Sequence, residues 1–532
     1  MALSILNKIR KGPFRDFRLI FLAVLSGVLL VFSFPKYGVG LLAWIAFVPL
    51  LLALQATNKP LSAALWGFLT GMVVHIGLLY WIAQVIVMYG YLPLYIGISA
   101  MILLSCVLSL YFSFFSAALV FLRNRGFSEI VSAPLLWVGL EYLKSHLFTG
   151  FPWENLAYSQ YKYLTIIQFT DITGIYGLSF IIIFVNVLVV DLISHRQHRR
   201  NLVPEVLAGC LILALIIGYG TFSLNRVNAE LKRAEAMEVS LIQGNIDQNI
   251  KWNPQYQEES VEIYKNMSLV KAPVGRGLIV WPETATPFFF QEKFDLSKIV
   301  RSIPRLTSDW LLFGSPSYIE EGNRTFYMNS AFLLSPDGKV AGKYDKVHLV
   351  PYGEYVPLRH YFPFINKLVA GIGDFRKGEG NIPLTFGNHS LGILICYEGI
   401  FPELSRAYKK EGAKLLVNIT NDAWFGRTSA PYQHLSMTVF RAVENRVFLL
   451  RSANTGISAI INPSGKIIKK TGLFERTTLR GSVKFLDRKT IYALYGDVFV
   501  YICLMLLGAV FFSSIKGELL SCWKNLSNKS TI

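Results

Sequence analysis

Long apolar runs fill most of the first 225 residues and recur once near the C-terminus. A helix needs about 20 predominantly apolar residues to cross a bilayer, and eight runs come close to or exceed that length. They are residues 19–34, 39–54, 61–85, 94–122, 130–147, 174–193, 206–224 and 492–515. The first two are short enough to form a tight or re-entrant pair, and the fifth is weakened by Pro134, Glu141 and Lys144. The sequence therefore predicts a membrane protein with about eight spans.

Basic residues cluster on alternate connections between these runs. Lysine and arginine gather before the first run, in the second, fourth and sixth connections and after the last run, whereas the third connection carries no charge. Cytoplasmic loops are enriched in these residues. We therefore predict a cytoplasmic basic N-terminus (1–18), a membrane domain with seven transmembrane helices (19–224), an eighth transmembrane helix (492–515) and a cytoplasmic tail (516–532).

Charge content sets residues 237–488 apart from the rest of the chain. The whole chain is 53% hydrophobic and 16% charged, against about 25% charged in an ordinary soluble domain. This segment, however, alternates strands, turns and charges like a soluble α/β domain, and seven predicted spans before it place it outside the cytoplasm. The net charge of +18 would suggest nucleic acid in a soluble protein. No nucleic-acid motif is present, so we attribute the charge to cytoplasmic loops and anionic lipid.

One cysteine stands out among the five in the chain. Cys396 is the only cysteine of the soluble segment, so it has no internal disulfide partner there. Residues 389–396 read as a strand and residues 401–412 as a helix, which places the thiol at a strand-to-helix turn. Such turns expose nucleophiles in α/β enzymes. The alternative is a small buried hydrophobic residue.

Two further residues are candidates for the same chemistry. Glu283 ends the apolar strand 277–283 directly after Trp281 and Pro282, where it could act as a general base. Lys346 follows a predicted hairpin with its turn at Pro336-Asp-Gly338 and could stabilise an oxyanion. Each could instead be an ordinary surface residue. The histidine and cysteine spacings indicate no metal site, and no nucleotide-binding motif occurs, so we predict no cofactor.

Six short segments, in order along the chain, resemble one family. They are Gly150-Phe-Pro-Trp153, Gln243-Gly-Asn-Ile-Asp-Gln-Asn-Ile-Lys-Trp252, Trp281-Pro-Glu-Thr284, Lys346-Val-His-Leu-Val-Pro-Tyr-Gly-Glu354, Cys396-Tyr-Glu398 and Asn421-Asp-Ala-Trp-Phe-Gly426. The order of carboxylate, lysine and cysteine resembles the nitrilase (carbon–nitrogen hydrolase) superfamily. Together with the spans, the segments resemble its membrane-bound members, the bacterial apolipoprotein N-acyltransferases.

The resemblance implies a fold, a reaction and a location. Residues 237–488 would form a four-layer αββα sandwich on the periplasmic side of the bacterial inner membrane. Cys396 would be the nucleophile, Glu283 the base and Lys346 the oxyanion-stabilising cation. The acyl donor would be a membrane phospholipid, with phosphatidylethanolamine and its sn-1 chain expected, and the acceptor a diacylglyceryl apolipoprotein. Nothing requires a partner subunit, so a monomer is expected. Essential supporting residues would be Trp252, Glu354, Tyr397 and Glu398.

Two apolar segments beside the predicted site are candidate membrane-entry arms. One follows the base and contains Phe288, Phe289 and Phe290, and the other covers residues 355–372 and contains Phe362 and Phe364. Acyl chains are costly to draw into water, at about 0.8 kcal/mol per CH₂, so we expect an apolar path from the bilayer to the thiol. The alternative for part of each segment is ordinary core packing.

The sequence is also compatible with two other functions. A membrane-tethered amidase could use the same three residues to hydrolyse a small amide. A transporter with an extracytoplasmic receptor domain would place ionisable residues at mid-span, where His75 is the main candidate.

Overall fold

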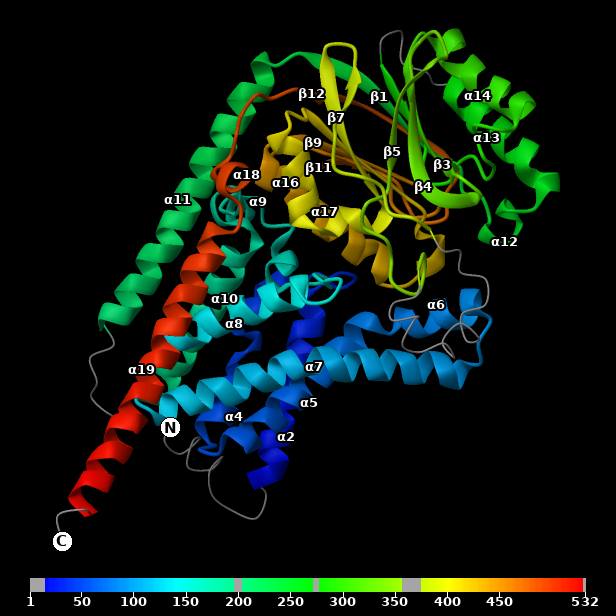
Figure 1. Cartoon of the computed structure of the whole chain (residues 1–532). Coiled ribbons are helices and arrows are strands. Elements are labelled where there is room, and N and C mark those ends of the chain that lie inside the picture. The colour runs from blue at the N-terminus through cyan, green and yellow to red at the C-terminus, as the bar shows by residue number, and fades with distance from the viewer. Residues whose placement is uncertain (1–14, 196–202, 271–276, 356–374, 530–532) are drawn as a thin grey trace.

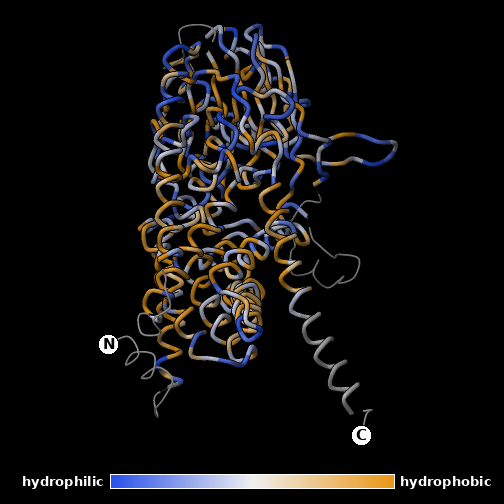
Figure 2. The backbone as a smooth tube through the Cα atoms, turned by 90° about the vertical axis from the view of Figure 1, so that its left-hand side faces the viewer, coloured by the Kyte–Doolittle hydropathy of each residue, from blue (hydrophilic) through white to orange (hydrophobic). Residues whose placement is uncertain are grey.

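A computed structural model describes residues 15–195, 203–270, 277–355 and 375–529. Helices from both ends of the chain form one half of the molecule, and a β-rich domain sits on top of them (Figure 1). Hydrophobic residues concentrate in the helical half, whereas the upper half mixes both kinds (Figure 2). The upper half contains the strands of residues 236–484, and the helical half contains the apolar runs that precede and follow them in the sequence.

The β-rich domain contains two six-stranded sheets. The first has the order β12-β1-β2-β3-β4-β5 and the second the order β11-β10-β9-β8-β7-β6. The strands of the first sheet are β1 (Ala236–Gln243), β2 (Leu278–Val280), β3 (Trp310–Glu321), β4 (Arg324–Leu334), β5 (Val340–Asp345) and β12 (Thr477–Lys484). Those of the second are β6 (Leu384–Phe386), β7 (His389–Ile395), β8 (Leu415–Thr420), β9 (Phe448–Ala453), β10 (Ala459–Ile461) and β11 (Ile467–Lys470).

The two sheets pack face to face, with helices on their outer faces. Strand β1 contacts β9, and β4 contacts β7 across the interface. Helices α13 (Gln257–Val270) and α14 (Phe294–Thr307) pack on the first sheet, and α16 (Pro402–Lys410) and α17 (Ala430–Asn445) on the second. The central strands β2 and β8 are buried along their whole length, which explains their continuous apolar sequences. This is the four-layer order that the resemblance implied.

Among the described residues, five helices are long and apolar enough to cross a membrane. By length and composition these are α2 (Arg15–Ser33), α5 (Pro60–Leu79), α7 (Leu94–Asn124), α10 (Thr170–His195) and α11 (Val203–Arg233). Near the other three predicted spans the chain forms α8 (Glu129–His146), the pair α18 (Ile491–Tyr495) and α19 (Val498–Lys529), and three short helices, η1 (Gly40–Leu42), α3 (Ala43–Ala46) and α4 (Val48–Gln55). A separate helix, α6 (Trp81–Gly90), takes the end of the third run. The count of eight spans stays a prediction.

The break in the second apolar run is held by a residue far away in the sequence. Asn186 of α10 accepts a hydrogen bond from the Phe47 backbone N–H (2.9 Å) and donates to the Ala43 carbonyl (2.9 Å). Irregular backbone at membrane depth is tolerated only where neighbouring protein satisfies its polar groups. Asn186 supplies those bonds, and the run therefore need not be one continuous helix.

Helix α17 joins the two halves of the molecule. It covers the second sheet and is buried along nearly its whole length. At its C-terminal end the guanidinium of Arg446 forms a buried ion pair with Asp171 of α10 (2.7 Å). Nearer its start, the Gln433 side chain donates to the Leu78 carbonyl at the end of α5 (3.2 Å). The soluble domain is thus packed directly on the helical half.

Candidate active site

Cys396 lies where strand β7 ends and the short helix η4 (Cys396–Ile400) begins. Its φ is +52°, an uncommon value for a residue other than glycine and one that costs roughly 1–3 kcal/mol. Two buried side chains hold this conformation, since the Cys396 carbonyl accepts hydrogen bonds from Asn418 Nδ2 (3.1 Å) and His434 Nε2 (3.2 Å). Backbone strain of this kind is typical of a positioned nucleophile.

Glu283 follows β2 and is held at both carboxylate oxygens. Its side chain is 6% exposed. Oε1 accepts from Asn329 Nδ2 (2.7 Å) and Oε2 from the Asn421 backbone N–H (2.8 Å). The chain around it packs closely on β3, because a Cβ on Gly314 would meet the Thr284 nitrogen at 2.5 Å. The carboxylate is therefore fixed in place.

Lys346 follows β5 and is 1% exposed. Its Nζ lies 2.8 Å from Glu354 Oε1, which also accepts from Asn329 Nδ2 (2.9 Å). Burial opposes the charged form of Lys346, but the carboxylates of Glu354 and Glu283 outweigh it, so the pKa of the ammonium is raised. Asn329 thus links both carboxylates beside a lysine that stays charged.

The thiol sits among these charges. Burial, and then the nearby Glu283 carboxylate, raise the pKa of Cys396 well above its ordinary value, and Lys346 opposes this shift only in part. A thiol is a poor nucleophile until it loses its proton. A base must therefore remove that proton during the reaction, and the geometry offers the Glu283 carboxylate for this step.

Glu398 joins the segments that carry the cysteine and the lysine. Its carboxylate accepts from the backbone N–H groups of Ile395 (2.7 Å) and Val347 (2.8 Å) and from the Tyr344 hydroxyl (2.9 Å). Burial raises its pKa to about 7 despite these hydrogen bonds. Glu398 therefore fixes the position of Cys396 relative to Lys346.

Tyr397 contacts the helical half, whereas Trp252 is half exposed. The Tyr397 hydroxyl donates to the Gly150 carbonyl of the helical half (3.5 Å), so it joins the turn to the predicted Gly150–Trp153 motif. Trp252 is 49% exposed. In the part of the chain that the structure describes, no hydrogen bond or ring contact joins it to Glu283, Lys346 or Cys396. Its neighbour Lys251 is buried and donates to the Glu283 carbonyl (3.3 Å).

Phe288 and Phe290 do not form the predicted membrane-entry arm, because both lie in the protein core. Phe288 and Phe290 are 4% and 2% exposed and belong to the core beneath α13 and α14. They are core residues, as the packing alternative predicted, and cannot reach a bilayer in this arrangement. Phe289 is half-buried and stacks on Tyr327 (5.7 Å between ring centroids). Phe362 and Phe364 lie outside the described residues.

Two family models and several relatives match this chain. Residues 26–188 match the model of the apolipoprotein N-acyltransferase N-terminal domain, and residues 238–491 match that of the carbon–nitrogen hydrolases. The apolipoprotein N-acyltransferase of Geobacter metallireducens is 48% identical over 92% of this chain and 94% of its own. That of Methylococcus capsulatus is 32% identical over 90% and 92%. The chain belongs to the apolipoprotein N-acyltransferase family.

The family assignment confirms the predicted class of enzyme, an acyltransferase within the nitrilase superfamily. Among solved structures, a mutant amidase of that superfamily from Nesterenkonia AN1 is 21% identical, covering 50% of this chain and 97% of its own with a TM-score of 0.38.

Several polar residues that hold Glu283 and Cys396 in place were not predicted from the sequence. Asn329 lies in the middle of β4, where nothing in the pattern distinguishes it from other strand residues. Asn421 acts through its backbone N–H, which no side-chain pattern reveals. His434, which holds the Cys396 carbonyl, is itself held by Arg451 (3.0 Å). A signal for Asn421 existed in the matching segment 421–426, which follows a buried strand directly.

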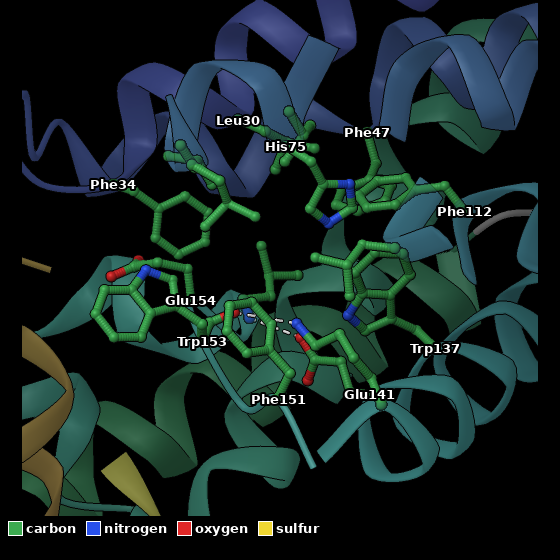
Figure 3. Close-up of a pocket in the computed structure, with 16 residues that line it drawn as sticks. Leu30, Phe34, Phe47, His75, Phe112, Trp137, Glu141, Phe151, Trp153 and Glu154 are labelled. Carbon is green, nitrogen blue, oxygen red and sulfur yellow. Dashed lines mark hydrogen bonds between the residues drawn. The ribbon is translucent and has the colours of Figure 1, made fainter. Parts of the chain in front are cut away.

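A second group of buried charges lies in the helical half of the acyltransferase. Glu141, Lys144, Glu154 and His75 line a cavity of about 40 Å³ between α5, α7 and α8 (Figure 3). Lys144 donates to the Trp153 carbonyl (3.2 Å), and Glu141 accepts from the Leu156 N–H (2.6 Å). These charges fasten the 150–156 connection beneath the site. A cavity of this size holds a few water molecules, so it gives no support to a transport path.

Proposed function

We propose that the chain moves a fatty acyl group from the sn-1 ester of phosphatidylethanolamine to the N-terminal α-amino group of a diacylglyceryl apolipoprotein, through a thioester on Cys396. The observation that carries the proposal is the strained cysteine with the Glu283 carboxylate and the Lys346 ammonium acting on its thiol. A carboxylate that can take a proton and a cation that cannot easily lose one supply the two functions that acyl transfer needs.

The first half-reaction acylates the enzyme. Glu283 takes the thiol proton, and the thiolate sulfur attacks the ester carbonyl of the phospholipid. The oxygen of the tetrahedral intermediate carries a negative charge, which the Lys346 ammonium stabilises. Collapse of the intermediate breaks the ester bond, and the leaving alkoxide takes the proton from Glu283. Lysophospholipid departs, and Cys396 carries the acyl group as a thioester.

The second half-reaction transfers the acyl group to the acceptor. The α-amino group of the S-diacylglyceryl cysteine attacks the thioester, and Lys346 again faces the developing oxyanion. Glu283 takes a proton from the attacking nitrogen and returns it to the leaving thiolate. The product is an N-acyl amide and the thiol is restored. Splitting the transfer through a thioester replaces one difficult step with two easier ones.

The helical half fits this proposal because both substrates are lipids. The soluble domain rests directly on apolar helices, which would place the thiol close to the bilayer that holds both substrates. We propose an enzyme of the bacterial inner membrane that acts as a monomer, with eight spans, the catalytic domain on the periplasmic side and both termini in the cytoplasm. Alternating basic connections support this orientation.

The thioester can be tested directly by intact mass. The purified protein is incubated with phosphatidylethanolamine and compared with Cys396→Ala and with Cys503→Ala, a matched cysteine replacement in α19. We expect an acyl-sized adduct on the parent protein and on the Cys503 variant but not on the Cys396 variant, and we expect it to disappear when a diacylated lipopeptide is added. An adduct that disappears equally fast in buffer alone would favour the amidase-like hydrolase instead. An active protein that forms no adduct would exclude the covalent mechanism.

A further inference from the structure

A cavity of about 320 Å³ lies between helix α6 and the rim of the soluble domain. Gln84, Met88 and Tyr89 line it from α6, and Asp247 and Gln248 line it from the segment after β1. The remaining wall includes η5 (Asp422–Phe425) and Thr455. The volume falls at the lower end of the range typical of ligand sites, about 300–1,000 Å³. The cavity is therefore large enough to hold a short stretch of polypeptide.

Two hydrogen bonds connect this cavity to the proposed base. Gln248 Oε1 accepts from Asn421 Nδ2 (2.7 Å), and the Asn421 backbone N–H donates to Glu283 Oε2 (2.8 Å). A group bound against Gln248 would therefore be separated by Asn421 from the carboxylate that receives the acceptor's proton. The position suits the acceptor of the second half-reaction.

The chemistry of the lining favours a peptide. Thr455 is 3% exposed, and its hydroxyl finds no hydrogen-bond partner among the described residues. Gln84, Asn245 and Gln248 add amide donors and acceptors, which match backbone N–H and C=O groups. Among the described lining residues there is neither lysine nor arginine. Arg427 lies over the Phe474 ring instead. A phosphate group would lack its usual partners here.

One wall of the cavity is aromatic and rigid. The rings of Tyr89 and Trp424 meet edge to face with 4.6 Å between centroids, and the Tyr89 hydroxyl donates to the Ala423 carbonyl (3.0 Å). These contacts hold α6 against η5, so the cavity is formed before any ligand arrives. A preformed wall of this kind lowers the entropy lost on binding.

We infer that this cavity binds the polypeptide that follows the N-terminal cysteine of the acceptor, an inference that rests on the proposed function. The lipid arms of that cysteine must stay with the membrane, and its amino group must reach the Cys396 thioester. Its carbonyl side must therefore leave in a third direction. The cavity, linked to Glu283 through Gln248 and Asn421, supplies one with groups that can hydrogen-bond a peptide backbone.

Two substitutions test this inference from opposite sides. Thr455→Val removes the unpaired hydroxyl with little change of shape, and Gln84→Trp narrows the cavity from the exposed side of α6, where folding is not at risk. Ile86→Ala, on the same helix but away from the lining, is the control. Each is assayed with a diacylated lipopeptide and with S-diacylglyceryl cysteine amide, which lacks the peptide. Thioester formation is measured separately with phosphatidylethanolamine.

We expect both cavity variants to raise KM for the lipopeptide about fivefold or more, the range that one hydrogen bond supplies, with little change for the acceptor that lacks a peptide. Equal losses on both acceptors would overturn the inference, and slower thioester formation would assign the cavity to the donor headgroup instead. If the parent protein forms no Cys396-dependent thioester at all, the proposed function itself fails, and the inference fails with it.

Discussion

Two of the groups of buried ionisable side chains in the molecule can be compared, one in the soluble domain and one among the helices. In the first, Glu283 and Lys346 act on a single thiol, and Glu354 pairs with Lys346. In the second, Lys144 and Glu141 bond to the backbone of one connection and hold it in place. Both groups place a buried lysine near carboxylates. Buried charge alone therefore does not mark an active site. The bonding partners of the buried charges distinguish a group that acts on a nucleophile from a group that holds the backbone.

Removal of the lysine from each group is the strongest test of this difference. Lys346→Met should slow thioester formation by roughly 10²–10³-fold, the usual effect of losing one oxyanion-stabilising donor. Lys144→Met, the same change in the other group, should alter the rate per folded molecule by less than about tenfold. Single-turnover acylation followed by mass spectrometry measures both. Similar rate losses in the two variants would contradict the comparison.

Asn329 tests whether the link between the two carboxylates matters. Asn329→Ala removes hydrogen bonds to Glu283 and Glu354. A hydrogen bond to a charged group contributes about 1.5–3 kcal/mol, so transfer should slow by roughly 10- to 100-fold. Asn124→Ala, at an exposed hydrogen bond at the end of α7, is the control. An unchanged rate in the Asn329 variant would show that Glu283 needs no such support.

Glu141 should matter for stability more than for rate. Glu141→Leu leaves the buried Leu156 N–H without its acceptor, which costs about 1–3 kcal/mol. The expected result is a lower unfolding temperature in detergent, with the acylation rate of the folded fraction nearly unchanged. A large loss of rate without a loss of stability would place this group in the reaction.

Lys251 gives a smaller, pH-dependent effect. Burial lowers its pKa to about 8, against the opposing influence of Glu283. Above pH 8 the folded protein has lost this proton while the unfolded chain keeps it up to the ordinary lysine value. The unfolded state therefore binds more protons, and stability should rise with pH in this window by up to about 1.4 kcal/mol per pH unit. In Lys251→Met this part of the slope should be absent, as unfolding at pH 8, 9 and 10 would reveal.

The sequence predicted Glu283, Lys346 and Cys396 as site residues because each follows an apolar or patterned strand, and in the structure the three groups lie near enough to interact electrostatically. The carboxyl ends of such strands gather at one edge, so spacing along the chain could suggest proximity. Asn329 and His434 lie inside regular elements, where sequence does not reveal which residue faces the site. Phe288 and Phe290 were predicted to enter the membrane but lie in the core. A short apolar run has the same sequence pattern in either place. The break at Phe47 depends on Asn186, a contact between distant parts of the chain.

Helix α17 has a practical consequence for anyone who wishes to express the soluble domain alone. One side of this helix supports Cys396 through His434, and the other carries Arg446 into an ion pair with the helical half. A fragment restricted to residues 238–491 would lose Asp171, Gln168 and Ser223, which hold the Arg446 guanidinium in the intact protein. It would also expose the side of α17 that packs on the helical half. Such a fragment should aggregate, and the smallest useful preparation of this enzyme retains its helices.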